Sequence, residues 1–264
     1  MSQSEGEREY YAQTYDVSVP DWPGEIDFYR RLAAQARSRG GAVLEVACGT
    51  GRVAMHLLRD GVRLVGLDLS PEMLDVARKK SAGFPAVRWV EADMRAFDLG
   101  EAFELVIIPG QAFHNLTTIG DQVACLSCIK RHLAPSGTFV LHLDHQDVRW
   151  LGDLRRDKGG VFETAEQFQH PETGRQVRTL RAWSYEPSTQ TAIAHTVWEE
   201  LGADGHVVSR REMGPYRLHC YFRFEVEHLL ARSGFAVEAL YGDFLRGELR
   251  DDSSEMVWMA TLMG

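Results

Sequence analysis

Five short apolar runs that alternate with helical patterns constrain the fold of this chain most strongly. The runs are 42–47, 62–69, 86–93, 103–110 and 138–144. Helical spacing of apolar residues, with glycine or proline as a stop, predicts helices over 25–40, 52–61, 70–80 and 121–133. Strands that are apolar on both faces are typical of a parallel sheet covered by helices on both sides. The first 145 residues therefore predict a doubly wound α/β sheet.

The pattern changes after Leu154. Segments 178–187, 191–202 and 206–213 are rich in β-formers, with turn signals between them and no helical pattern, which predicts an antiparallel insertion. A helix over 222–234 and strands over 235–244 and 255–263 follow. We expect a seven-stranded sheet with an antiparallel strand at its C-terminal end. The predicted domains are an N-terminal helical lid segment (1–40), a Rossmann-like domain (41–150 with 222–264) and a β-rich insertion covering the acceptor site (151–221).

Composition restricts the class of protein. The net charge of −9 over 264 residues argues against a nucleic-acid partner, whose phosphates favour a clustered basic surface. No apolar run reaches the roughly 18–20 residues of a membrane helix, and the polar N-terminus carries no secretion signal. Four cysteines are few for this length, which favours a reduced cytoplasmic protein. Cys125 and Cys128 lie within a predicted helix and are expected in the core, so no metal site is predicted.

Polar and glycine residues gather where the predicted strands end, which is where open α/β sheets bind ligands. Glycines let backbone N–H groups and a helix N-terminus approach a ligand closely. An acid after the second strand can accept both hydroxyls of a ribose, and an acid after the third can accept an exocyclic amine. The residues concerned are Gly49, Gly51, Asp68, Asp93, Met94, Pro109, Gly110, Gln111 and His114.

Two nucleotide chemistries compete for this site. Gly49-x-Gly51-x-x-Ala54 also matches a relaxed dinucleotide fingerprint, with an acid near the expected distance. Three features favour a different ligand. Glu45 lies inside the first strand, a second acid–hydrophobe pair follows the third strand, and the chain ends in an antiparallel strand pair instead of a second βαβαβ half.

The chain resembles the class I S-adenosylmethionine-dependent methyltransferases, of the bacterial small-molecule type. The residues that carry the resemblance are LEVACGTG (44–51), VGLDLSPEMLDVAR (65–78), EADMRAF (91–97) and FELVIIPGQAFHNL (103–116). The resemblance is strong over roughly 40–145 and weaker over 223–263. Many relatives have glycine where Ala47 stands.

The resemblance implies S-adenosylmethionine as cofactor and S-adenosylhomocysteine as product. It places Gly49 and Gly51 near the amino-acid end of the cofactor, Asp68 on the ribose and Asp93 on the adenine amine. The other residues that it places at the cofactor are Tyr11 and Tyr15 in a mobile lid, Glu45, Ala47, Arg52, Leu69, Met73, Met94, Pro109 and Gly110.

The acceptor side is less defined. His114 follows the fourth strand and is a candidate general base. Arg217, His219 and Tyr221 alternate onto one face if their segment is extended, and together with Gln111 and His114 they are the candidate acceptor-binding residues. Trp183, Tyr185 and Trp198 are expected in the core of the insertion.

The predicted function is transfer of a methyl group to nitrogen or oxygen of a small-molecule acceptor by in-line displacement (EC 2.1.1.-). Two alternatives remain, a non-catalytic or regulatory S-adenosylmethionine-binding protein and an NAD(P)-dependent oxidoreductase. The segment after the fourth strand lacks the Asn/Asp-Pro-Pro-aromatic stretch typical of nucleic-acid amine methylation in this family. We expect no nucleic-acid or membrane partner, and a monomer or homodimer.

Overall fold

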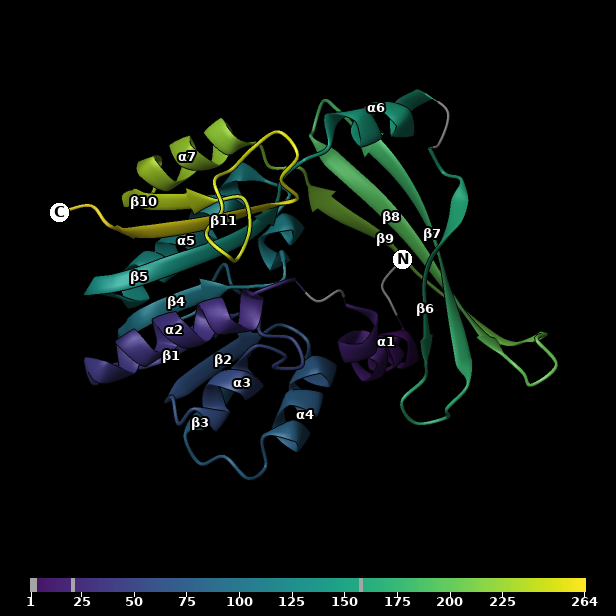
Figure 1. Ribbon diagram of the computed structural model, residues 1–264, viewed down its shortest axis with the longest axis horizontal. Coiled ribbons are helices and arrows are strands. Elements are labelled where there is room, and N and C mark those ends of the chain that lie inside the picture. Colours follow the sequence, from purple (N-terminus) through teal and green to yellow (C-terminus); the bar gives the residue numbers. More distant parts are fainter. Residues whose placement is uncertain (1–3, 20–21, 157–158) are drawn as a thin grey trace. The chain divides into compact units, whose positions relative to one another are not determined.

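The computed structural model describes residues 4–19, 22–156 and 159–264, so residues 1–3, 20–21 and 157–158 of the predicted segments lie outside the described residues. The chain divides into two compact units. The larger unit comprises Asp21–Gln146 and Tyr221–Gly264, and the smaller unit comprises Met1–Pro20 and Asp147–Cys220. Each unit is built around its own sheet (Figure 1).

The larger unit contains a seven-stranded sheet. Its strands are β1 (Val43–Val46), β2 (Leu64–Asp68), β3 (Val87–Glu91), β4 (Phe103–Ile108), β5 (Leu133–Asp144), β10 (Phe235–Tyr241) and β11 (Glu255–Leu262). They are ordered β10-β11-β5-β4-β1-β2-β3. Strands β1 to β5 pair in parallel, and β11 pairs antiparallel with both β5 and β10. This arrangement confirms the predicted doubly wound sheet with an antiparallel end strand.

Helices of the larger unit give the sheet two apolar cores. They are α2 (Glu25–Ser38), α3 (Ala54–Arg59), α4 (Pro71–Lys80), α5 (Ile119–His132), α7 (Arg223–Arg232) and the short 3-10 helix η1 (Ala112–Asn115). Residues of β1 alternate between the cores, because successive side chains of a strand point to opposite faces. Val43 packs with α2 and α3 in one core, whereas Leu44 packs with α5 and α7 in the other.

Helix and strand ends follow local chemistry, with two differences from prediction. The Ser70 hydroxyl accepts the Met73 N–H at 3.2 Å, which confirms the predicted cap of α4. Thr118 caps α5 in the same way through the Asp121 N–H at 3.1 Å, so α5 begins earlier than expected. The segment 135–137, predicted as a turn, lies inside β5, where the pairing with β4 is irregular.

The smaller unit combines two helices with a four-stranded antiparallel sheet in the order β6-β7-β8-β9. Its elements are α1 (Glu5–Ser18), α6 (Val148–Arg156), β6 (Phe162–Gln169), β7 (Gln176–Glu186), β8 (Thr191–Leu201) and β9 (Val207–His219). Tyr10 of α1 packs with Phe168, Val177, Trp198 and Met213 of the sheet. The first helix and the β-rich segment therefore belong to one compact unit.

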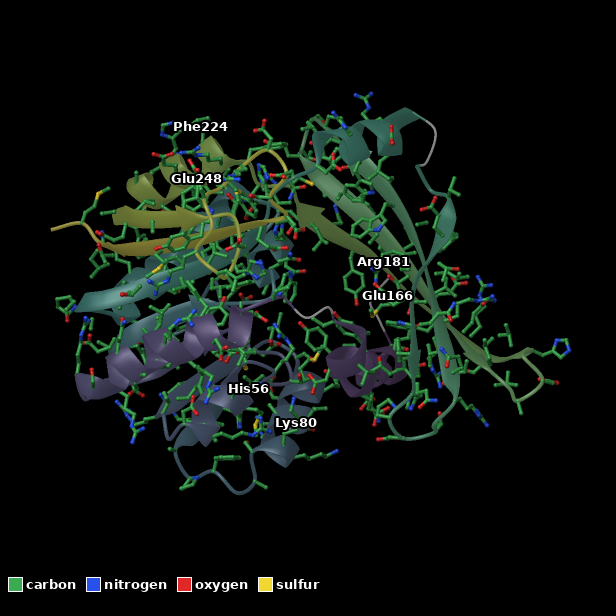
Figure 2. The ribbon with its side chains drawn as sticks, in the orientation of Figure 1. His56, Lys80, Glu166, Arg181, Phe224 and Glu248 are labelled. Carbon is green, nitrogen blue, oxygen red and sulfur yellow. The ribbon has the colours of Figure 1, made fainter. Side chains whose placement is uncertain are left out.

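Two elements of the smaller unit, β6 and α6, were not predicted. Most β6 residues are exposed, and its sequence FETAEQFQ offers no run of alternating apolar residues. Glu166 of β6 instead pairs with Arg181 of β7 at 2.9 Å, as the labelled side chains in Figure 2 show. No helix among the described residues is long and apolar enough to cross a membrane.

Candidate functional site

The loop after β1 is a tight turn that requires left-handed backbone at three positions. The φ angles are 55° at Ala47, 54° at Gly49 and 72° at Gly51. Glycine adopts such angles without strain, but alanine does not. The Gly51 N–H donates to the Cys48 carbonyl at 2.9 Å, and α3 begins three residues later. The loop therefore brings its backbone to the carboxyl end of β1.

We expect Ala47→Gly to be unusually well tolerated. Relief of the left-handed strain at Ala47, about 1 kcal/mol, offsets the similar entropy that glycine adds to the unfolded chain. The free energy of unfolding by urea should stay within about 0.5 kcal/mol of wild type. Ala33→Gly, in the interior of α2, is the matched control and should lose about 1 kcal/mol or more. Equal losses in the two variants would contradict this explanation of the loop.

Asp68, the last residue of β2, fixes the loops around it. Its Oδ2 accepts the Gly49 N–H at 2.7 Å, and its Oδ1 accepts the Ser70 N–H at 2.9 Å. Burial raises the pKa of Asp68, while these backbone hydrogen bonds oppose the rise. The Leu69 backbone also hydrogen-bonds this carboxylate. A carboxylate offers about four lone-pair sites, so Asp68 can still accept from a ligand hydroxyl.

Glu45 lies in the middle of β1 and is 1% exposed. Its Oε2 has no hydrogen-bond partner among the described residues. Burial raises the pKa of Glu45 to about 8. A buried polar atom without a partner is costly, so such an atom beside a ligand loop is a candidate contact for a polar ligand group.

Arg52, which was predicted to contact the cofactor, pairs with a residue of α2. Its Nη1 and Nη2 donate to the two carboxylate oxygens of Glu25 at 2.6 and 2.8 Å. Glu25 is 1% exposed, and the guanidinium also lies 5.2 Å from the ring centroid of Trp22. Arg52 therefore acts first as the counter-ion of a buried acid. Sequence reasoning missed Glu25 and Trp22, whose only signal was an acid in the first turn of a helix.

Asp93 and its neighbours lie after β3. Arg95 donates to Asp93 at 2.6 Å and to Asp121 at 2.9 Å, and the Arg95 hydrogen bonds lower the pKa of Asp93. Met94 packs at the edge of the core. An adenine amine at Asp93 would share that carboxylate with Arg95.

Leu69 and Met73 flank Asp68 on the chain but differ in exposure. Leu69 is 65% exposed, whereas Met73 is 7% exposed. Leu69 therefore presents an apolar surface beside Asp68, and Met73 contributes mainly to the packing of α4.

The end of β4 is a second strained turn. Gly110 and Gln111, after Pro109, have φ angles of 61° and 63°. The Gln111 amide donates to Asp144 at the end of β5 and to Glu255 at the start of β11. Burial, with the nearby charge of Glu255, raises the pKa of Asp144 to about 7. Asp144 can therefore hold or release a proton near neutral pH.

Sequence reasoning did not select Asp144 or Glu255. The signal available for Asp144 was its position, because it ends β5 as Asp68 ends β2. Glu255 also bonds the fully buried His142 of β5 at 2.6 Å.

His114 lies in η1 and is 4% exposed. Its Nε2 accepts the Asp144 backbone N–H at 3.1 Å, and its ring stands edge-on to Tyr221 at 5.3 Å. A nitrogen that already accepts a backbone hydrogen bond is a poor acceptor for a substrate proton. The role of His114 as general base stays a prediction, and this geometry supports a structural role more directly.

The expected polar face at Arg217, His219 and Tyr221 is not formed. Arg217 pairs with Glu186 at the surface at 2.6 Å, and β9 ends at the buried His219. Tyr221 belongs to the larger unit, is fully buried, and donates its hydroxyl to the Leu116 carbonyl at 3.1 Å. The alternation stops because the chain passes from the end of one unit into the core of the other.

The predicted lid tyrosines pack on the sheet of the smaller unit. The Tyr11 ring is 6.0 Å from Trp198 and 6.3 Å from Tyr216, and Tyr15 stands edge-on to Tyr11 at 5.5 Å. Trp198 is buried in this core as expected.

The four cysteines are buried and none forms a disulfide. Cys125 and Cys128 lie in the core of the larger unit, as predicted. Among the residues that the structure describes, no group of three or more His, Cys, Asp or Glu side chains is placed to hold a metal ion.

Comparison with known proteins decides between the two nucleotide chemistries. A family model described as a methyltransferase domain matches residues 43–137, which run from β1 into β5 and include Asp68 and Asp93. The chain carries a methyltransferase domain over these residues. Its tight loop is therefore the first motif of this methyltransferase domain.

Relatives of the methyltransferase domain include sugar-modifying enzymes. The dTDP-3-amino-3,4,6-trideoxy-alpha-D-glucopyranose N,N-dimethyltransferase of Streptomyces venezuelae is 30% identical over 135 residues, which are 50% of this chain and 56% of that protein. Matched segments span only about half the length of the curated relatives.

Solved structures resemble the whole chain. The CcbJ methyltransferase from Streptomyces caelestis has a TM-score of 0.77 at 26% identity, over 97% of this chain and 98% of that one. The amino pentose methyltransferase CalS10 from Micromonospora echinaspora, solved with S-adenosylmethionine bound, has a TM-score of 0.66 at 23% identity, over 100% and 98%. The second likeness shows the shared fold.

The residues present fit S-adenosylmethionine. The unpartnered oxygen of Glu45 suits an ammonium group, and the spare lone pairs of Asp68 suit ribose hydroxyls. Exposed Leu69 offers an apolar contact beside them.

Proposed function

We propose that this protein is an S-adenosylmethionine-dependent methyltransferase that moves a methyl group to nitrogen or oxygen of a small-molecule acceptor. The observation that carries the proposal is the presence of two acids around one strained loop, inside a methyltransferase domain: Asp68, which accepts the Gly49 N–H, and buried Glu45, whose Oε2 has no hydrogen-bond partner among the described residues. Asp68 ends β2 and Glu45 is the last residue but one of β1, near the strand ends where open α/β sheets bind ligands.

The roles of individual residues follow from their surroundings. Glu45 would bind the ammonium group and Asp68 the ribose hydroxyls, while Asp93 would accept the adenine amine. Gly49, Gly51 and Gly110 let the backbone approach, and Leu69 contacts the apolar part of the nucleoside. When bound, the cofactor supplies an electrophilic methyl group on a sulfonium.

On the acceptor side, the protein must orient the nucleophile and exclude water. An ammonium acceptor must first lose a proton. Asp144, with a pKa raised to about 7, is better suited to receive it than His114, whose Nε2 is already a hydrogen-bond acceptor. Gln111 holds Asp144 and Glu255 together at this position.

An amine on a sugar-like molecule is the acceptor class that we favour. Relatives at 30% and 32% identity are named as N,N-dimethyltransferases of dTDP-linked amino sugars. The net charge of −9 supports a protein that does not bind nucleic acid. We further propose that it acts in the cytoplasm, as a monomer or homodimer.

A turnover assay tests the proposal. The full chain is mixed with S-adenosylmethionine and pairs of small sugars and sugar nucleotides that differ only in an amine or a hydroxyl. We expect one S-adenosylhomocysteine for each methyl group found on the acceptor by mass spectrometry, with the amine member preferred. Tight cofactor binding without turnover on any acceptor would instead indicate a regulatory binding protein.

A further inference from the structure

A cluster of polar side chains from α2, β1 and the loop after β1 lies in the larger unit. Its members are Glu25, Tyr29, Glu45 and Arg52, which we call the Glu45 cluster. The two glutamates are each 1% exposed, and Tyr29 is fully buried. Neither the Glu45 Oε2 nor the Tyr29 hydroxyl has a hydrogen-bond partner among the described residues. Two orphaned polar atoms in one buried cluster mark a place built to receive a polar group.

The cluster contains two carboxyls and one guanidinium, and the guanidinium is paired with one of the carboxyls. Arg52 makes a two-pronged ion pair with Glu25, at 2.6 and 2.8 Å, which is the strongest arrangement for this pair of groups. The Glu45 Oε2 has no hydrogen-bond partner among the described residues. A buried carboxyl in that position favours its neutral, protonated form.

Surrounding groups agree with a neutral Glu45. Burial raises its pKa to about 8, the charge of Glu25 adds to the rise, and Arg52 and Lys80 oppose it. Lys80, labelled on α4 in Figure 2, lies 3.5 Å from the Thr50 hydroxyl.

Other neighbours of Glu45 do not supply a charge at neutral pH. Burial raises the pKa of the Tyr29 hydroxyl and of the Cys48 thiol, so both groups stay neutral. The adjacent strands place Gly66 and Ile107 opposite Glu45, and neither residue titrates.

We propose that the amino-acid end of the cofactor displaces a proton from Glu45 when it binds. Glu25 is a positioning residue. It holds Arg52 in an ion pair, and Glu45 therefore stays protonated until the ligand binds. This inference rests on the proposed function, because it needs a ligand with an ammonium group at the loop. The ammonium then becomes the partner that the Glu45 Oε2 lacks, and the displaced proton goes to solvent.

The proton balance gives a pH dependence with a definite sign. Below about pH 8, free Glu45 is protonated and the free ligand is an ammonium, so forming the ion pair releases a proton and affinity rises with pH. Above the ordinary amine pKa of about 7.7–8.0, the ligand must take up a proton to bind, so affinity falls again. Net release should be close to one proton at pH 7, near zero at about pH 8, and should turn into uptake at pH 9.

Calorimetry measures this directly. S-adenosylhomocysteine is titrated into the full chain at pH 7 in buffers with different ionisation enthalpies, and the slope of heat against ionisation enthalpy gives the protons exchanged. 5′-Methylthioadenosine is the control ligand, because it keeps the adenosine thioether and lacks the amino-acid end. We expect release with the first ligand and none with the second. Binding of S-adenosylhomocysteine without release would overturn the inference but leave the proposed function standing, whereas no binding of either ligand would count against the proposed function.

Variants test the positioning role. Glu25→Gln removes one charge and frees Arg52, and both changes favour ionised Glu45, so proton release at pH 7 should fall and the affinity optimum should move to lower pH. Glu45→Gln should bind without release. Asp60→Asn, which breaks the surface pair between α2 Arg30 and Asp60, is the matched control and should release as wild type does. If Glu25→Gln bound S-adenosylhomocysteine more weakly but released as many protons as wild type, Glu25 would have only a structural role.

Discussion

Asp68→Ala should reduce the affinity for S-adenosylhomocysteine at least about 100-fold. Hydrogen bonds to a charged acceptor contribute roughly 1.5–3 kcal/mol each, and about 1.4 kcal/mol is a factor of ten in affinity. The variant loses the acceptor for two ribose hydroxyls. It also loses the acceptor that holds the Gly49 and Ser70 N–H groups at 2.7 and 2.9 Å, so the loop itself is released. Isothermal titration measures the affinity.

Two further variants separate these effects. Asp68→Asn keeps one acceptor oxygen and the side-chain shape, so it should bind more tightly than Asp68→Ala while remaining weaker than wild type. Asp75→Ala removes an exposed acid of α4, paired with Arg78 at the surface, and should bind as wild type does. Unchanged affinity in folded Asp68→Ala would refute the ribose assignment.

Gly66→Ala should strongly destabilise the larger unit. A Cβ at Gly66 would lie 2.3 Å from Cζ3 and 2.6 Å from Cε3 of the Trp89 ring, and 3.0 Å from the Cys48 sulfur. No rotation of a planar ring in a packed position relieves such contacts, so we expect a loss of about 1–3 kcal/mol in the free energy of unfolding. Urea denaturation followed by circular dichroism measures it.

Gly83→Ala is the matched control. Nothing lies within 4 Å of a Cβ at Gly83, and its φ is not positive, so the variant should be as stable as wild type or more so. Trp89→Leu should recover part of the loss in the Gly66→Ala background, although it is destabilising alone. Additive losses in this double-mutant cycle would show that Trp89 is not the cause.

Trp89 also corrects the interpretation of the glycine loop. Sequence reasoning assigned Gly51 to close approach by a ligand, but a Cβ there would also lie 2.8 Å from the Trp89 ring. One tryptophan of β3 therefore requires glycine both in β2 and in the loop. This requirement depends on which strands pair, and a single sequence does not state that.

The buried parallel strands and the strand-end acids were predictable because both follow from local patterns. Continuous apolar runs indicate buried parallel strands, and Asp68 follows its strand directly. Glu25 and Tyr29 were not predictable, since they reach Glu45 only through the packing of α2 against β1. The prediction of a polar face that includes Tyr221 was wrong for a related reason. Periodicity does not reveal where a chain leaves one unit for another.

We expect the strained loop with Glu45 and Asp68 to bind S-adenosylmethionine and not a dinucleotide. Parallel calorimetric titrations of the full chain with S-adenosylhomocysteine and with NADH test it most directly. We expect one S-adenosylhomocysteine to bind per chain, and no heat of binding from NADH. Saturable binding of NADH, with none of S-adenosylhomocysteine at millimolar concentration, would contradict it.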